Sequence, residues 1–296
     1  MTMATETRAT VPDWGTWFRM RMQASAGLAW PSLLLWTLGL GPILLILTIS
    51  VFHNEQAGGY SAAFELDNYR RLLDSRYLGV FAFSLWLSAL VAVISVAIGF
   101  PFTWFVSQLR PRTQVLWLVF LLTGLSLSEV LIAFSWQVLL SRNIGITGIL
   151  VSLGLMERKI SLQPGFGALL TSLVYFVIPY TFLLFYPPIS RLDRSLTEAA
   201  RTMGAGPATT FFTVVVPALR TPIIGSLILV FVYVLGAYVT PTQLGKPEHW
   251  TISVYITDQA TTAYNLPFGA ALAVVLMVIS IAMVAFTARL GREGAR

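Results

Sequence analysis

Apolar residues occupy six long runs in this chain, and polar residues gather between them. A helix needs about 20 apolar residues to cross a hydrocarbon core of about 30 Å, and each run is long enough. The predicted spans are approximately 30–52, 78–106, 115–140, 168–189, 219–242 and 267–289. Several contain proline, which membrane helices tolerate where neighbouring groups satisfy the freed carbonyl. The pattern therefore predicts an all-α membrane protein with six transmembrane helices.

The composition supports lipid as the solvent of this chain. Hydrophobic residues make up 56% of it, charged residues make up 11%, and the mean hydropathy is +0.75. Soluble domains carry about 25% charged residues. There is no cysteine, and the two histidines, His53 and His249, fall outside the spans, which argues against a thiolate or histidine metal cluster. The arginines are scattered among loops rather than gathered in a patch, so nucleic acid is not an expected partner.

The distribution of basic residues predicts the orientation. With the N-terminus in the cytoplasm, twelve Lys and Arg residues fall inside and seven fall outside. Short cytoplasmic loops are enriched in Lys and Arg, so this bias favours both termini inside. The predicted domains are a cytoplasmic tail (1–27), a transmembrane domain (28–290) and a second tail (291–296). The first apolar run is too long for a cleaved signal peptide. Residues 11–27 fit either an amphipathic surface helix or a disordered tail.

A polar island at about 191–220 separates the fourth and fifth spans. Ser195 and Glu198 have the spacing of a capping box that begins a helix. Gly204 stands where a helix ends in a left-handed residue, and Pro207 suits the first turn of a second helix. The sequence thus predicts a compact helix–turn–helix, after which the chain re-enters the membrane at Pro217. From local chemistry alone, Glu198 and Gly204 equally fit the simple roles of capping and ending a helix.

The spacing within this island resembles a family pattern. Glu198-Ala199-Ala200, three residues, Gly204, nine residues and then Val214-x-Val216-Pro217 is similar to the motif of inner-membrane permeases in binding-protein-dependent ABC importers. Valine replaces the family's isoleucine and leucine and keeps the apolar character. The stretches 66–74, 99–105, 236–245 and 267–271 also resemble permeases of the spermidine/putrescine type. Residues 126–136 differ from that group, so the resemblance indicates the class of transporter and leaves its substrate open.

The resemblance implies a type I permease fold, a multi-pass location in the bacterial inner membrane and a set of partners. These are two ATPase subunits, a second and different permease, an external substrate-binding protein and the lipid bilayer. It implies a non-catalytic translocation subunit for a small, polyamine-like cation. The ATPase-coupling residues that it implies are Glu198, Ala199, Ala200, Gly204 and Pro217. The chain itself has no Walker A sequence, so ATP and Mg²⁺ are expected in a partner and no cofactor is expected here.

Glu129 is the one acid placed inside a predicted span. An intramembrane carboxylate is costly and faces either a cavity or a polar partner. Two roles fit it: meeting the cationic group of a solute, or bonding polar groups of a neighbouring helix. The weaker candidates for the solute pathway are polar residues of the later spans: Tyr175, Tyr180, Tyr233, Tyr238, Thr240 and Gln243.

Two other functions compete with an importer subunit. An ion-coupled secondary transporter usually carries repeated halves and several intramembrane ionisable residues. Here one intramembrane acid and no obvious repeat are found, and such a carrier would not need the island at 191–220. An intramembrane enzyme would need a nucleophile with a base or a metal cluster. No Gly-x-Ser-x-Gly sequence and no intramembrane histidine is present.

Overall fold

The computed structural model describes residues 14–55, 59–142 and 144–293 and is mostly helical. It divides into two compact units, residues 1–49 and 50–296. In the first unit, α1 runs from Trp14 to Ile49 without a break, and its span-forming part is Pro31–Ile49. Residues 14–27 are therefore helical. Residues 1–13 of the predicted N-terminal tail, and 294–296 of the predicted C-terminal tail, lie outside the described part of the chain.

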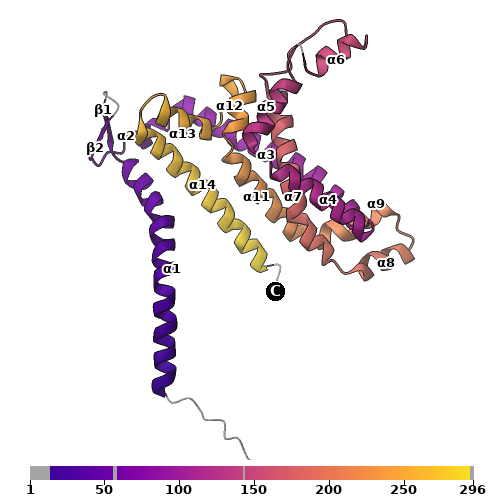
Figure 1. The fold of residues 1–296 in the computed structure, drawn as a ribbon, viewed down its shortest axis with the longest axis horizontal. Coiled ribbons are helices and arrows are strands. Elements are labelled where there is room, and N and C mark those ends of the chain that lie inside the picture. The colour runs from indigo at the N-terminus through magenta and orange to yellow at the C-terminus, as the bar shows by residue number, and fades with distance from the viewer. Residues whose placement is uncertain (1–13, 56–58, 143, 294–296) are drawn as a thin grey trace, which may run out of the picture. The chain divides into compact units, whose positions relative to one another are not determined.

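The second unit holds the other helices and one small antiparallel ladder (Figure 1). The ladder pairs β1 (His53–Glu55) with β2 (Gly59–Ser61) and was not predicted from the hydropathy pattern. The longer helices are α3 (Ser75–Ser107), α4 (Pro111–Leu125), α5 (Glu129–Leu139), α7 (Phe166–Ser190), α11 (Arg220–Leu235), α13 (Ile252–Thr261) and α14 (Leu266–Glu293). The shorter ones are α2 (Asp67–Arg71), α6 (Ile146–Ser152), α8 (Arg194–Thr202), α9 (Pro207–Thr210), α10 (Val216–Ala218), α12 (Val239–Leu244), a π-helical turn (Phe211–Val215) and a 3-10 turn (Pro247–His249).

Four described helices are long and apolar enough to cross a membrane, and two bent pairs bring the number of candidate spans to six. The predicted third span is not one straight helix, because α4 and α5 meet at 91°. The break falls at Ser126–Ser128, where Ser128 has an extended backbone. Serine competes for local backbone hydrogen bonds and so weakens a continuous helix. Glu129 therefore lies at the start of a new helix rather than within an unbroken span.

The fifth span also differs from its prediction at both ends. A 75° bend at Leu219 separates Pro207–Ala218 from α11. The helix then stops at Leu235, where Gly236 provides the C-cap, and a separate short helix, α12, follows. The predicted continuation to residue 242 is thus two helices. A hydropathy window does not register such breaks, because the apolar character of the sequence continues across them.

The core of the second unit lies where α3, α7 and α11 pack together. Leu87 and Val91 of α3, Leu173 of α7 and Val230 of α11 are all buried in one cluster. Small residues allow this approach, as they commonly do between membrane helices. A Cβ on Gly99 of α3 would lie 2.4 Å from Thr181 Oγ1 of α7, which is far inside normal contact. The two helices therefore touch with no room for a larger side chain at that point.

The contact at Gly99 predicts a position-dependent effect of added volume. We expect Gly99→Ala to lower stability by about 1–3 kcal/mol, the usual cost of overpacking a filled contact. Gly79 lies in the same helix and has nothing within 4 Å of the place that an added Cβ would take, so Gly79→Ala is the matched control. The thermal unfolding midpoint in detergent should fall for the first variant alone. Equal midpoints for the two variants would contradict this packing account.

Candidate functional site

The island between the fourth and fifth spans forms a compact helical knob. Its first helix, α8, begins at Arg194 and not at the predicted Ser195 cap. Asp193 is the N-cap residue, and its carboxylate accepts the backbone N–H of Ser195 at 2.9 Å. The predicted capping box is therefore wrong, because the aspartate two residues earlier already takes the first free amide. Hydrogen bonds from Ser195, the backbone N–H first, also lower the pKa of Asp193 below its ordinary value.

The predicted glycine turn is confirmed. Gly204 has a φ of +86°, the left-handed conformation that glycine adopts at least cost. The amide of Gly204 donates to Arg201 O, and that of Ala205 donates to Ala200 O, each at 3.0 Å. These two bonds form the motif that satisfies the last carbonyls of a helix. Pro207 then occupies the first turn of α9, as predicted, and Pro217 lies in α10 just before the bend into α11.

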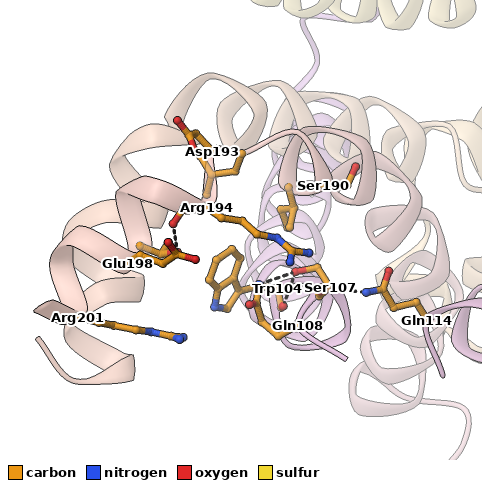
Figure 2. A pocket seen from close by; sticks show the side chains of 12 residues that line it. Trp104, Ser107, Gln108, Gln114, Ser190, Asp193, Arg194, Glu198 and Arg201 are labelled. Carbon is orange, nitrogen blue, oxygen red and sulfur yellow. Dashed lines mark hydrogen bonds between the residues drawn. The ribbon is translucent and has the colours of Figure 1, made fainter. Parts of the chain in front are cut away.

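A polar pocket of about 240 Å³ lies between α8 and the turn from α3 to α4. Figure 2 shows the Arg194, Glu198 and Arg201 side chains extending from α8 toward Trp104 and Ser107 at the end of α3. Within the described residues, no ion pair involves Arg194, Arg201 or Glu198. Glu198 thus faces a pocket of its own chain.

The floor of this pocket is held by one glutamine. Gln114 Nε2 of α4 donates to Ser107 O at 3.0 Å and to Leu109 O at 2.8 Å. Its other amide atom, Oε1, accepts from the Tyr186 hydroxyl of α7 at 2.9 Å. The end of α3, the start of α4 and the lower part of α7 are therefore tied together beneath the knob.

The opposite face of α8 is apolar and exposed. Leu196 and Met203 keep 47% and 87% of their surface accessible, and Ala199 lies exposed between them. Positions three or four residues apart lie on one side of a helix, so these side chains form a single stripe. Ala200 is half-buried at its edge. The helix is therefore amphipathic, with its charged side toward the membrane domain and its apolar side away from it.

The second group of predicted site residues meets at the other end of the bundle (Figure 1). Glu129 Oε1 accepts from Thr240 Oγ1 at 3.0 Å and from the Thr240 backbone N–H at 3.3 Å. Thr240 is the second residue of α12, so its amide has no partner within that helix. A carboxylate at a helix N-terminus also interacts favourably with the helix dipole. Glu129 therefore caps α12 from α5, which is the structural role predicted as one of its alternatives.

Glu129 also lines a small cavity of about 160 Å³ beside α7 and α11. Tyr233 and Phe176 line the same cavity, and their rings stack with centroids 6.0 Å apart. Tyr180 also stacks on Tyr233, with the two ring centroids 5.3 Å apart. A carboxylate beside aromatic faces is suited to an organic ammonium group, which binds both. Glu129, Tyr233 and Thr240 are thus brought together.

The other pathway candidates lie around this cavity but not in it. Tyr175 lines a neighbouring apolar cavity of about 400 Å³ and packs edge-on against Trp136. Tyr238 precedes α12 and is exposed. Gln243 bonds with Gln137, whose Nε2 donates to both the backbone carbonyl and Oε1 of Gln243 at 2.8 Å. Sequence reasoning missed Gln137 and Phe176. The spacing of Phe176 four residues before Tyr180 was the available signal.

The comparisons with known proteins identify the family of this chain. The family model described as "Binding-protein-dependent transport system inner membrane component" matches residues 19–293, so the chain belongs to that family. It is therefore a permease subunit of an ABC importer in the inner membrane, and the ion-coupled carrier is disfavoured. The family implies an ATPase and a substrate-binding protein as partners.

Individual relatives support the same class, and a solved structure matches the fold. The chain is 28% identical over 238 residues to the spermidine/putrescine permease protein PotB of Escherichia coli K12, covering 80% of this chain and 86% of that one. It is 26% identical to a PotC homologue of Mycoplasma genitalium, covering 81% and 82%. A chain of a bacterial alginate ABC transporter, solved with an alginate-bound periplasmic protein, matches its fold with a TM-score of 0.73, covering 93% and 96% at 15% identity.

The turn at Gly204 generates a prediction about the order of the knob. A side chain in the left-handed conformation costs about 1–2 kcal/mol, so Gly204→Ser should loosen the end of α8. Gly206 has an ordinary φ of −69° and nothing within 4 Å of an added Cβ, so Gly206→Ser is the matched control. Amide hydrogen exchange across residues 196–204 should be about tenfold faster in the first variant only. Unchanged exchange in Gly204→Ser would contradict this role of the glycine.

Proposed function

We propose that this permease subunit imports a small cationic organic solute, polyamine-like in chemistry, by coupling to ATP hydrolysis in a separate chain. The proposed coupling to an ATPase rests on the amphipathic knob, whose exposed apolar stripe has no partner within the described part of the chain. The observation that supports a cationic solute is the carboxylate of Glu129 beside stacked aromatic rings. The names of PotB and the PotC homologue support the same class of solute.

The stripe formed by Leu196, Ala199 and Met203 is the proposed contact with the ATPase. Apolar side chains held in water on a rigid helix gain stability when a partner covers them. The alanines at 199 and 200 leave room for the partner backbone to approach closely. Because the charged face of α8 points into the permease, a push on the apolar face would press Arg194, Glu198 and Arg201 toward the α3–α4 turn.

The predicted coupling residues then have distinct parts in this proposal. Glu198 lines the polar pocket on the permease side of α8, Ala199 and Ala200 meet the partner, and Gly204 fixes the turn. Pro217 stands at the bend where the knob joins α11, so motion of α8 and α9 would be passed on to the fifth span.

The assembled importer would contain two ATPase subunits, a second permease of different sequence and an external binding protein. ATP and Mg²⁺ would bind to the ATPase subunits, and the present chain would supply no cofactor site. One carboxylate neutralises one ammonium group, so a solute with several charges would need further acids from the second permease.

Glu129 would serve the solute pathway through the same carboxylate that caps α12. Its Oε1 is engaged by Thr240, and the side chain also borders the cavity that Tyr233 and Phe176 line. A bound ammonium group would gain a charged hydrogen bond and contact with aromatic faces. Its arrival would weaken the hold of Glu129 on Thr240, which connects solute binding to the position of α12.

The apolar stripe predicts that a charge at Met203 separates the permease from its ATPase. A buried unpaired carboxylate is costly, so Met203→Glu should reduce the amount of ATPase that co-purifies with the chain by about tenfold or more. Met203→Leu keeps the apolar contact and is the matched control. Quantitative co-purification from membranes measures both. Full retention of the ATPase by Met203→Glu would remove the stripe from the coupling interface.

The cavity predicts a charge effect at Glu129 that differs from a structural effect. In Glu129→Gln the amide oxygen still accepts from Thr240, so the fold should persist while the charge is lost. A hydrogen bond to a charged group contributes about 1.5–3 kcal/mol, so solute uptake should fall by roughly 10- to 100-fold. The control Thr240→Val removes the hydroxyl donor and keeps the charge. Uptake of labelled putrescine or spermidine into proteoliposomes measures both variants, and unchanged uptake by Glu129→Gln would remove its proposed contact with the solute.

A further inference from the structure

The segment between α5 and α7 carries a surface that the proposed function has not used. We name residues 140–142 and 144–165 the α6 protrusion. Figure 1 shows α6 beyond the ends of α5 and α7, standing apart from α12 and α13. The predicted orientation puts this end of the bundle on the external side. The protrusion is therefore the part of the second unit that reaches outward from the fourth span.

Hydrogen bonds hold the protrusion in a defined shape. Thr147 Oγ1 donates to Ile160 O at 2.7 Å, and the Thr147 side chain is buried. Arg142 Nε donates to Lys159 O at 3.1 Å, and the Leu162 amide donates to Leu140 O at 3.1 Å. The segment that leaves the membrane and the segment that returns to it are thus joined by three hydrogen bonds. An ordered segment loses less conformational entropy on binding than a slack linker.

Large apolar side chains are exposed on this ordered segment. Ile144, Leu153 and Leu155 keep 78%, 66% and 70% of their surface accessible. Ile149 and Ile160 are also exposed. Large apolar side chains that are exposed repeatedly along one ordered segment indicate an interaction surface rather than a solvated loop.

The protrusion also carries basic side chains. Arg142, Arg158 and Lys159 line an open hollow together with Ile160 and Ser161. None of these three cations forms an ion pair within the described residues, and Glu157 is the one acid of residues 140–165. A cationic solute would be repelled here, so this charge does not serve solute capture. It suits a macromolecular partner that presents carboxylates.

We propose that the α6 protrusion is the docking surface for the external solute-binding protein, which presents carboxylates to Arg142, Arg158 and Lys159 and apolar side chains to Leu153 and Leu155. This assignment rests on the proposed function. A membrane surface is the less suitable partner, because α6 has seven residues and offers too short an apolar face to lie in the headgroup region. It also lies beyond the helix ends rather than alongside them.

The test uses the complete importer in nanodiscs and its purified, solute-loaded binding protein. The variant Arg158→Glu/Lys159→Glu reverses two charges of the basic hollow. We expect the concentration of binding protein that gives half-maximal stimulation of ATP hydrolysis to rise about tenfold or more, with unchanged hydrolysis in its absence. The maximal rate should return at saturating binding protein. Added salt should raise this half-maximal concentration of binding protein more for the unaltered importer than for the variant.

The matched control is Arg70→Glu/Arg76→Glu, which reverses two charges on the same side, in α2 and at the start of α3. An equal effect of both double variants, or none from the first, overturns the docking assignment while leaving the proposed function in place. An effect seen with phosphatidylglycerol in the nanodiscs but absent with phosphatidylcholine alone would assign the protrusion to lipid headgroups instead. Absence of any stimulation in the unaltered importer would overturn the proposed function and this assignment together.

Discussion

The break in the fifth span depends on one constraint: backbone groups at membrane depth need hydrogen-bond partners. Where α11 stops and α12 starts, the freed groups find these partners on other elements. Ser253 Oγ donates to Leu235 O at 2.9 Å, and Thr251 Oγ1 donates to Ala237 O at 3.2 Å. Glu129 accepts the Thr240 amide, and the Gly165 amide donates to Leu244 O at 2.9 Å. Irregular backbone survives in lipid only when protein or water satisfies it in this way.

The same partners shape the proposed solute site. Glu129 joins α5 to α12 at one point, and Gln137 joins them again through Gln243. The two helices that follow the breaks in the third and fifth spans, α5 and α12, therefore support each other. The gap left beside Gly236 and Ala237 becomes the cavity that Tyr233 and Glu129 line. One carboxylate thus stabilises the break and supplies the charge that makes the cavity suitable for a cation.

The sequence predicted the features that local chemistry determines. Hydropathy located four span-length helices and the two bent pairs. Gly204 and Pro207 marked the turn and the second helix of the knob, and the spacing from Glu198 to Pro217 identified the family. The cap of α8 was misplaced because Asp193 and Ser195 are both good cap residues and only the three-dimensional bond decides between them. The bond between Glu129 and Thr240 spans 111 residues of sequence, so no local pattern contains it. The direction of the charged face of α8 likewise depends on where the α3–α4 turn lies.

The close approach of α3 and α7 at Gly99 has a mechanical consequence. With no gap between Gly99 and Thr181, neither helix has room to slide or roll against the other there. We infer that α3 and α7 move as one rigid pair. Any deformation during a working cycle then has to be concentrated at the articulations on either side, the 91° corner between α4 and α5 and the 75° corner ahead of α11. The tight contact at Gly99 would in this way restrict bending of the subunit to these two corners.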